Sequence, residues 1–301
     1  MTNYSFYKHR WIYISVAIVV ILAGIVSFFV SGLNIDIDFK GGTSIVFNTM
    51  SDSATKEEIE QIVRDNVDVK GSVVVQPSME KPTEYTIKMQ SLSTEESDKV
   101  INALKEKYVP SEENFDDYSI SSFTAAYGKQ LAGEAIWAVV IALILMLVYI
   151  TFRFEFLQGV CAVIGLLHDT LIMLAVYTIF MVPVNSSFIA VILTILGYSI
   201  NNTIVVFDRV RENKKFARKE TTEEIVDKSL NGTLMRSINT TITTFIMVVC
   251  LYIFGGTSIK EFSFPLMIGL IGGAYSSLFI VAPVWAMMKG GNKPTQTKKA
   301  K

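Results

Sequence analysis

Residues 187–213 read SFIAVILTILGYSINNTIVVFDRVREN, and this stretch decides the class of fold. Its apolar part, 187–207, is long enough to cross a bilayer as a helix, which takes about 20 residues. Amide and hydroxyl side chains interrupt this run near its end, and a charged segment follows. Because polar groups inside a membrane span are costly, those that occur there are candidates for function. The stretch therefore predicts a membrane helix with a functional polar segment.

Further apolar runs of similar length accompany this one along the chain. The predicted spans cover residues 11–32, 133–152, 159–181, 187–207, 234–254 and 264–288. A soluble protein does not need several such runs, and only 18% of the residues are charged. The first run is followed by Leu33-Asn34 rather than by a small-x-small cleavage site, so it predicts a retained helix and not a signal peptide. We therefore expect a polytopic α-helical membrane protein with six transmembrane helices.

Basic residues near the span ends indicate the orientation. They gather in the N-terminal segment 1–10, at Arg153, in a predicted loop at 208–231 and in the tail 289–301, whereas the alternate short connections hold only Lys260. Positively charged flanks stay on the cytoplasmic side of a membrane. Both termini and the basic loop are therefore expected to be cytoplasmic, and the tail is expected to lie on membrane lipid.

A polar stretch between the first two spans, 33–129, is long enough to fold as a domain of its own. Its patterns predict the order βαββαβ, which is typical of a split βαβ, ferredoxin-like α+β domain. The predicted elements are a strand at 43–50, a helix at 55–67, strands at 72–76 and 84–89, a helix at 93–108 and a strand at 118–123. The predicted orientation places this domain outside the cytoplasm.

The composition excludes several kinds of site. Cys161 and Cys250 lie in apolar runs, and histidine occurs only at His9 and His168, so a disulfide framework and a multi-histidine zinc centre are excluded. Residues 33–129 hold 18 acids and 10 bases, which argues against a nucleic-acid surface. The sequence contains no motif for an intramembrane protease and no phosphate-binding glycine loop. We expect no enzyme activity, no metal and no cofactor.

One polar pair lies deep in the third span. His168 and Asp169 are about ten residues from either end of that span, from where Asp169 cannot reach water. One interpretation is a proton or ion relay. The other is a structural pair that neighbouring helices satisfy and that locks the bundle.

A second polar group belongs to spans four and five. Its candidate residues are Ser199, Asn201, Asn202, Arg236, Asn239 and Thr240. Arg236 and Thr240 fall on one face of a helix, with Asn239 beside them, and that face is unsuited to lipid. Because the two spans are consecutive helices, Asn202 and Arg236 should lie at similar depth and can meet. Alternatively, Arg236 is a basic flank whose side chain reaches the membrane surface.

Small residues recur in the sixth span. Gly269, Gly273 and Ser277 follow one another at intervals of four residues, so they lie on one face of a helix. Such a face lets two helix backbones approach closely in a membrane. The pattern therefore predicts close helix packing rather than chemistry.

Three segments resemble one family closely. Residues 197–213, GYSINNTIVVFDRVREN, resemble the long signature of the SecF family of protein-export membrane subunits. Residues 37–43, IDFKGGT, are similar to the second hallmark of that family, and His168-Asp169 matches a third. Arg236 matches the arginine of the family in span five. The signature residues in these segments are Asp38, Gly41, Gly42, Gly197, Tyr198, Asp208, Arg209 and Arg211.

The resemblance implies one half of an RND-superfamily transporter in the bacterial cytoplasmic membrane. Such a half pairs with SecD, associates with the SecYEG channel on which SecA acts from the cytoplasm, and uses a proton or sodium gradient to draw the exported polypeptide outward. The family usually has an acid where this chain has Asn202, which cannot titrate. The carboxylate that carries the ion then comes from Asp169, from the SecD partner, or from no group in this chain.

Two other functions stay open at this point. The chain can be a non-conducting scaffold that stabilises SecD and the channel, which Asn202 favours. It can also be half of an RND-type efflux pump, although one six-span half is about half the size that such a pump needs.

Overall fold

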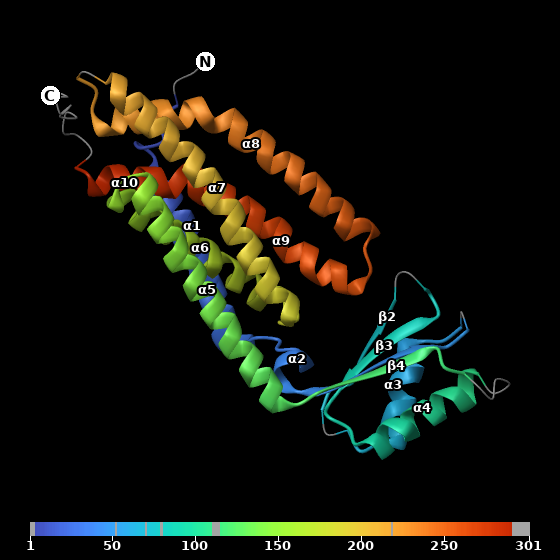
Figure 1. The fold of residues 1–301 in the computed structure, drawn as a ribbon. Coiled ribbons are helices and arrows are strands. Elements are labelled where there is room, and N and C mark those ends of the chain that lie inside the picture. The colour runs from blue at the N-terminus through green and yellow to red at the C-terminus, as the bar shows by residue number, and fades with distance from the viewer. Residues whose placement is uncertain are drawn as a thin grey trace.

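The computed structural model describes residues 4–51, 53–69, 71–78, 81–109, 115–217 and 219–290. It consists of a long helical bundle with a small α/β domain at one end, while the first and last described residues lie near the opposite end (Figure 1). We call that opposite end the terminal end of the bundle. Of the predicted tail 289–301, all but the first two residues lie outside the described ranges.

Within these ranges, six helices are long and apolar enough to cross a membrane, as predicted. They are α1 (Arg10–Ser31), α5 (Ala125–Arg153), α6 (Phe156–Ile179), α7 (Ser186–Phe216), α8 (Thr222–Phe254) and a final span made of α9 (Thr257–Tyr275), the π-helical turn η1 (Ser276–Val281) and α10 (Ala282–Met288). The helices α6 and α7 and the final span hold most of the buried residues, whereas α1, α5 and α8 expose most of their apolar side chains. Outward-facing apolar side chains suit a lipid surrounding.

The predicted basic loop at 208–231 is wrong, because most of this segment is helical. Helix α7 continues to Phe216 and α8 begins at Thr222, so residues 217–221 alone connect the two helices. Lys, Arg and Glu are good helix formers, and the edge of the membrane does not by itself end a helix. The two helices therefore carry their basic residues beyond the apolar region as rigid extensions.

The α/β domain holds a four-stranded antiparallel sheet with the strand order β2-β3-β1-β4. Its elements are β1 (Gly42–Asn48), α3 (Lys56–Asn66), β2 (Val74–Pro77), β3 (Glu84–Met89), α4 (Thr94–Tyr108) and β4 (Tyr118–Phe123). This is the predicted βαββαβ order, and in the sheet a strand of one βαβ half lies between the two strands of the other. Ile45 of β1 lies opposite Ile87 of β3, and both pack in a core with α3 and α4.

Two local features of the outer domain differ from the prediction. Strand β1 ends at Asn48 rather than at residue 50, because Met50 has a positive φ of 51°, which breaks the strand. A short helix, α2 (Ile37–Lys40), precedes β1 and was not expected. Asp36 caps α2 by accepting a hydrogen bond from the backbone N–H of its first residue.

Glycines allow α2 to pack closely against the start of α5. Gly41 has φ 81°, and a Cβ there would lie 2.7 Å from the backbone nitrogen of Ala125. A Cβ at Gly128 would lie 2.2 Å from the backbone oxygen of Phe39. Thr124 caps α5, so the helix begins inside the stretch assigned to the outer domain. The domain is thereby joined to the bundle through a tight backbone contact.

Candidate functional site

The central polar cluster of the bundle surrounds Asp169 of α6, whose side chain is 0% exposed. One carboxylate oxygen, Oδ2, accepts hydrogen bonds from Ser199 Oγ of α7 at 2.5 Å and from Ser276 Oγ of the final span at 2.9 Å. The other, Oδ1, lies 2.9 Å from Nδ1 of His168. Three spans thus supply polar groups to this cluster, which compensates for the removal of the carboxylate from water.

The π-helical turn η1 brings two serines of the final span to this cluster. Ser276 bonds to Asp169, while Ser277 donates to the backbone oxygen of Ser199 at 3.1 Å. The hydroxyls of Ser277 and Thr203 are also 3.1 Å apart. A π-helical turn holds one extra residue, and such turns are frequent at functional sites. The cluster therefore extends as a chain of hydroxyl groups between α7 and the final span.

Close packing of the final span against its neighbours is confirmed at the small residues. A Cβ at Gly269 would lie 2.6 Å from Cδ1 of Ile195, and one at Gly273 would lie 3.1 Å from Cβ of Ser199. The next small residue in the series, Ser277, is fully buried. The glycines therefore let α9 approach α7 closely enough for serine side chains to bond across the interface.

The cluster can hold a charge or a proton in the middle of a membrane span. An ionised carboxylate only accepts hydrogen bonds, whereas a protonated one also donates. The second ring nitrogen of His168, Nε2, is buried and has no hydrogen-bond partner within the described ranges. Both interpretations of the pair, relay and structural lock, agree with this geometry. No group of three or more His, Cys, Asp or Glu among the described residues could hold a metal ion.

The polar face of α8 lies on the outside of the bundle. Arg236, Asn239 and Thr240 are all exposed. The hydroxyl of Thr240 donates to the backbone oxygen of Arg236 at 2.9 Å, and that of Thr243 donates to the backbone oxygen of Asn239 at 3.0 Å. The threonines are thus satisfied within their own helix. The guanidinium and the amide are not suited to lipid, so this face calls for a polar partner.

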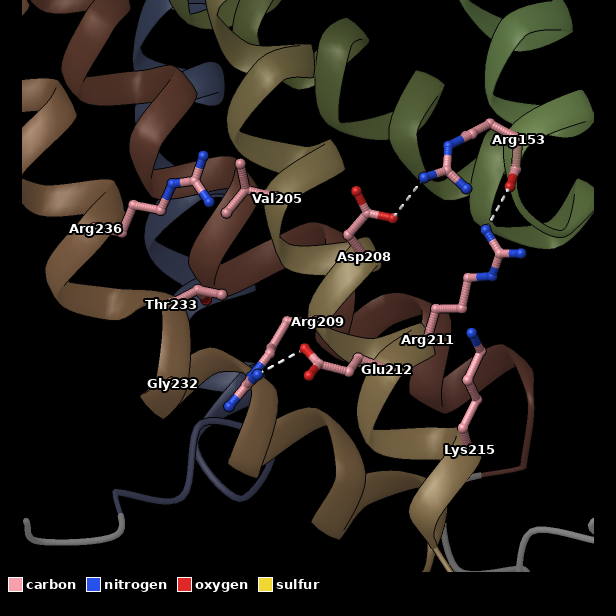
Figure 2. A pocket seen from close by; sticks show the side chains of 10 residues that line it. All are labelled: Arg153, Val205, Asp208, Arg209, Arg211, Glu212, Lys215, Gly232, Thr233 and Arg236. Carbon is pink, nitrogen blue, oxygen red and sulfur yellow. Dashed lines mark hydrogen bonds and ion pairs between the residues drawn. The ribbon is translucent and has the colours of Figure 1, made fainter.

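The structure does not join Asn202 to Arg236. Asn202 is buried in the bundle, and its Nδ2 has no hydrogen-bond partner in the part of the chain that the structure describes. Arg236 instead extends beside Val205 at a cavity (Figure 2). Asn201 lies on another face of α7 and is exposed. The expected contact is therefore absent, because one residue faces the core and the other lies on an open surface.

The charged part of the signature lies at the terminal end of the bundle. Asp208 pairs with Arg153 at 3.4 Å, and Arg209 pairs with Glu212 at 2.6 Å (Figure 2). Arg211 donates a hydrogen bond to the backbone oxygen of Arg153 at 3.3 Å. The contacts of Asp208 and Arg211 with Arg153 join the extension of α7 to the end of α5, whereas the Arg209–Glu212 pair lies within α7.

Gly197 and Tyr198, the first two residues of the signature at 197–213, lie on α7 further from the terminal end than the charged residues. Tyr198 donates its hydroxyl to Thr241 Oγ1 at 2.7 Å, which links α7 to α8. Gly197 is exposed, and no heavy atom lies within 4 Å of the position that a Cβ would take there. The glycine therefore leaves an open place on the surface of α7.

The second hallmark lies at the other end of the bundle. Asp38 Oδ2 accepts hydrogen bonds from both the backbone nitrogen and the hydroxyl of Ser186, at 2.9 and 2.8 Å. Ser186 is the first residue of α7. A Cβ at Gly42 would lie 2.5 Å from the backbone oxygen of Met89, so only glycine fits there. The hallmark thus ties the outer domain to the start of α7.

Sequence reasoning missed several polar residues that the structure brings together. Ser276 completes the central cluster, and Glu261 accepts hydrogen bonds from Gln76 at 3.1 Å and from Asn185 at 3.0 Å. Glu261 thus links strand β2 and the start of α7 to the final span. A polar residue inside an apolar run, or an acid at the start of one, is the signal that could have drawn attention to these positions.

Comparisons with known proteins agree with this arrangement. A family model described as "Protein export membrane protein SecD/SecF, C-terminal" matches residues 102–291. The protein translocase subunit SecF of Petrotoga mobilis is 36% identical over 303 residues, which cover 98% of this chain and 99% of that protein. The protein translocase subunit SecDF of Bacillus subtilis is 39% identical over 276 residues, which cover 90% of this chain and 36% of that protein.

A solved structure also shares the fold. The crystal structure of SecDF from Thermus thermophilus, described as a translocon-associated membrane protein, matches with a TM-score of 0.79 and 27% identity, over 95% of this chain and 38% of that chain. The matched family model includes the Asp169 cluster and the charged signature, and the full-length relatives extend over the outer domain as well. The chain therefore belongs to the SecF family of protein translocase subunits.

Proposed function

We propose that this chain is an auxiliary subunit of the Sec translocation machinery that, together with SecD, uses an ion gradient to promote late steps of polypeptide export. The SecF relatives support the auxiliary role, and the relatives named SecDF support SecD as the partner. The further partners that we propose are the SecYEG channel, with SecA acting on the cytoplasmic side, and the exported polypeptide. The membrane is then the bacterial cytoplasmic membrane, and the basic terminal end lies in the cytoplasm.

The burial of Asp169 in the middle of the bundle is the observation that carries the ion-coupled part of this proposal. Asn202 cannot titrate, so Asp169 is the acid of this chain that lies at the centre of the membrane region. One elementary charge that crosses 100 mV releases about 2.3 kcal/mol, which shifts a two-state equilibrium roughly fiftyfold. Protonation of one carboxylate is therefore enough to favour one helix arrangement over another.

The hydrogen bonds of α7 offer a route from this cluster to the outer domain. Ser199 binds Asp169 in the middle of α7, and Asp38 holds Ser186 at its first turn. Near the start of the final span, Glu261 accepts a hydrogen bond from Gln76 of β2. Small helix shifts are a common way to couple distant sites. A shift of either span on protonation would move the sheet relative to the bundle.

A non-conducting scaffold is the second candidate function, and two observations favour it. Asn202 cannot titrate at a position where the resemblance implies an acid, and the polar face of α8 is open to a partner. If SecD supplies the titrating carboxylate beside Arg236, this chain holds the conducting subunit in place without carrying the ion itself.

The test is completion of precursor export in membrane vesicles that hold the chain with SecD, with and without an imposed ion gradient. Asp169→Asn keeps the size of the side chain but cannot titrate, so it should remove the acceleration by the gradient. Asp98→Asn changes an exposed carboxylate on α4 of the outer domain and serves as the matched control that keeps the acceleration. If the gradient still accelerates export in Asp169→Asn, the ion is carried by SecD and the chain is a scaffold.

A further inference from the structure

A cavity of about 750 Å³ opens at the terminal end of the bundle, where α5, α7 and α8 leave the apolar region (Figure 2). Its lining cations are Arg153, Arg209, Arg211, Lys215 and Arg236. They come from three different helices, so the fold itself concentrates them around one space. Neither the central cluster nor the attachment of the outer domain uses this cavity.

The cations of the cavity are only partly neutralised. Two acids also line it, and each already has a partner: Asp208 pairs with Arg153 at 3.4 Å and Glu212 pairs with Arg209 at 2.6 Å. Arg211, Lys215 and Arg236 have no carboxylate partner among the described residues. Five cations and two acids leave a net charge of +3 (5 − 2). The cavity therefore calls for an anion with several acceptor oxygens.

Val205 lines the cavity, and exposed apolar residues stand next to its cations along α5 and α8. Phe152, which precedes Arg153, is 89% exposed, and Met235, which precedes Arg236, is 63% exposed. Towards the middle of the membrane region, Leu145 of α5 is 62% exposed. The helices α5 and α8, which both contribute cations to the cavity, thus also carry exposed apolar side chains. A ligand that is anionic at one end and apolar at the other fits both parts.

We propose that this cavity binds the phosphate headgroup of an anionic phospholipid, with the acyl chains lying along α5 and α8. Guanidinium groups match phosphate oxygens with paired N–H donors, and basic pockets between membrane helices bind anionic headgroups. The terminal end is the basic end of the bundle, where such a headgroup lies at the depth of the membrane surface. The proposal does not rest on titration at Asp169, and its variants leave Arg236, which the cavity shares with the polar face of α8, unchanged.

Native mass spectrometry of the complex with SecD tests the proposal. The probes are phosphatidylglycerol and phosphatidylcholine with identical acyl chains, together with inorganic phosphate. The wild-type complex should prefer phosphatidylglycerol. The double variant Arg211→Gln with Lys215→Gln should weaken that binding roughly thirtyfold, which is the effect of removing two cations from an anionic headgroup. Binding of phosphatidylcholine should not change.

Two matched variants separate this site from general surface charge. Lys219→Gln with Lys228→Gln removes the same charge from exposed positions near the connection of α7 and α8, and should leave lipid binding within about twofold. Arg211→Lys with Lys215→Arg keeps the charge and should keep the binding, while unchanged binding of phosphatidylcholine to the glutamine variant shows that its loss is not a folding defect. Equal loss in the two glutamine variants would overturn the proposal.

Two further outcomes would also contradict it. If inorganic phosphate binds as tightly as phosphatidylglycerol, the cavity is a site for small anions and the exposed apolar side chains of α5 and α8 have no part in binding. If the Arg211→Gln and Lys215→Gln variant loses SecD while each remaining complex binds lipid as before, the cavity belongs to the contact between subunits.

Discussion

The central cluster and the polar face of α8 are both polar regions of membrane spans, but they differ in how their groups are satisfied. Around Asp169, side chains of α6, α7 and the final span turn inward, and the carboxylate has three polar partners. On α8, Arg236 and Asn239 are exposed, and no carboxylate partner of Arg236 lies among the described residues. The cluster is complete within one chain, whereas the face is complete only when a partner covers it.

This difference separates two roles that a polar residue in a membrane span can have. A closed cluster contributes to the stability of its own chain, because each lost partner leaves a buried group unpaired. An open face contributes little to the stability of its own chain and much to assembly. Substitutions in the two regions should therefore be told apart by unfolding measurements on the chain without SecD.

The largest effect is expected from Asp169→Ala. The change leaves the hydroxyls of Ser199 and Ser276 and the ring of His168 without their common acceptor, and breaking a buried charged network costs about 3–5 kcal/mol. Unfolding in mixed detergent micelles measures this cost. Asp208→Ala removes an exposed carboxylate and should cost about 1 kcal/mol or less. If Asp169→Ala and Asp208→Ala lowered the free energy of unfolding equally, the hydrogen bonds around Asp169 would not stabilise the chain as proposed.

Ser199→Ala should have the next largest effect. It removes one hydrogen bond to a buried carboxylate, and such bonds contribute about 1.5–3 kcal/mol to the free energy of unfolding. Thr194→Ala is the control on the same helix, since Thr194 is exposed and bonds only to the backbone of its own helix at 2.7 Å. The control should stay within about 0.5 kcal/mol of wild type. A Ser199 variant as stable as this control contradicts the assignment.

A smaller, pH-dependent effect is expected at Glu155, between α5 and α6. Burial alone would raise the pKa of Glu155, but hydrogen bonds from Lys214 and Lys289 outweigh it and lower the pKa below its ordinary value of 4.5. Because the folded-state pKa is the lower one, the stabilisation is present above pH 4.5 and is lost as the pH falls through the folded value.

The size of this pH-dependent stabilisation indicates whether Glu155 behaves like the buried central cluster or like the exposed face of α8. Its side chain is 43% exposed, so screening limits the contribution to about 1 kcal/mol or less. Thermal unfolding between about pH 3 and pH 7 should therefore show a shallow loss of stability in wild type that is reduced in Glu155→Gln. Glu106→Gln, on the surface of α4, should keep the wild-type profile. A steep loss of stability over this pH range would instead show that Glu155 stabilises the chain as strongly as the buried groups around Asp169.

The smallest effect on the chain itself is expected from Arg236→Gln. Because Arg236 is exposed and has no carboxylate partner within the described ranges, its removal should change the free energy of unfolding by about 0.5 kcal/mol or less. Co-purification with SecD should fall instead, since the open face loses its cation. A large loss of stability with unchanged co-purification would show that the face is not an assembly surface.

Much of the fold could be predicted because it depends on local patterns. The spans follow from the length of apolar runs, and the two helices of the outer domain follow from Thr55 and Ser93, whose side chains cap them as expected. The ends of the helices could not be predicted from hydropathy, since α7 runs to Phe216, beyond the apolar part that ends at residue 207. Charged residues that favour helix extend it past the membrane region.

The candidate site was less predictable, because it depends on how helices are rotated relative to one another. The helical period places Arg236 and Thr240 on one face, and both are indeed exposed together. That period does not say which face of α7 meets α8, so Asn202 was expected near Arg236 although it lies in the core. Ser276 was missed because its position depends on a π-helical turn, which departs from the regular period.

The turn η1 also sets the phase of everything that follows it in the final span. With one extra residue, the helix serves two surfaces at once: Ser276 reaches Asp169, and Trp285 packs against Phe207 with ring centres 6.2 Å apart. A π-helical turn winds more widely than an α-helix and so absorbs the extra residue, which leaves α10 in the phase that packs the indole in the core. The final span thus gains a residue at the polar cluster without disturbing the apolar packing that follows it.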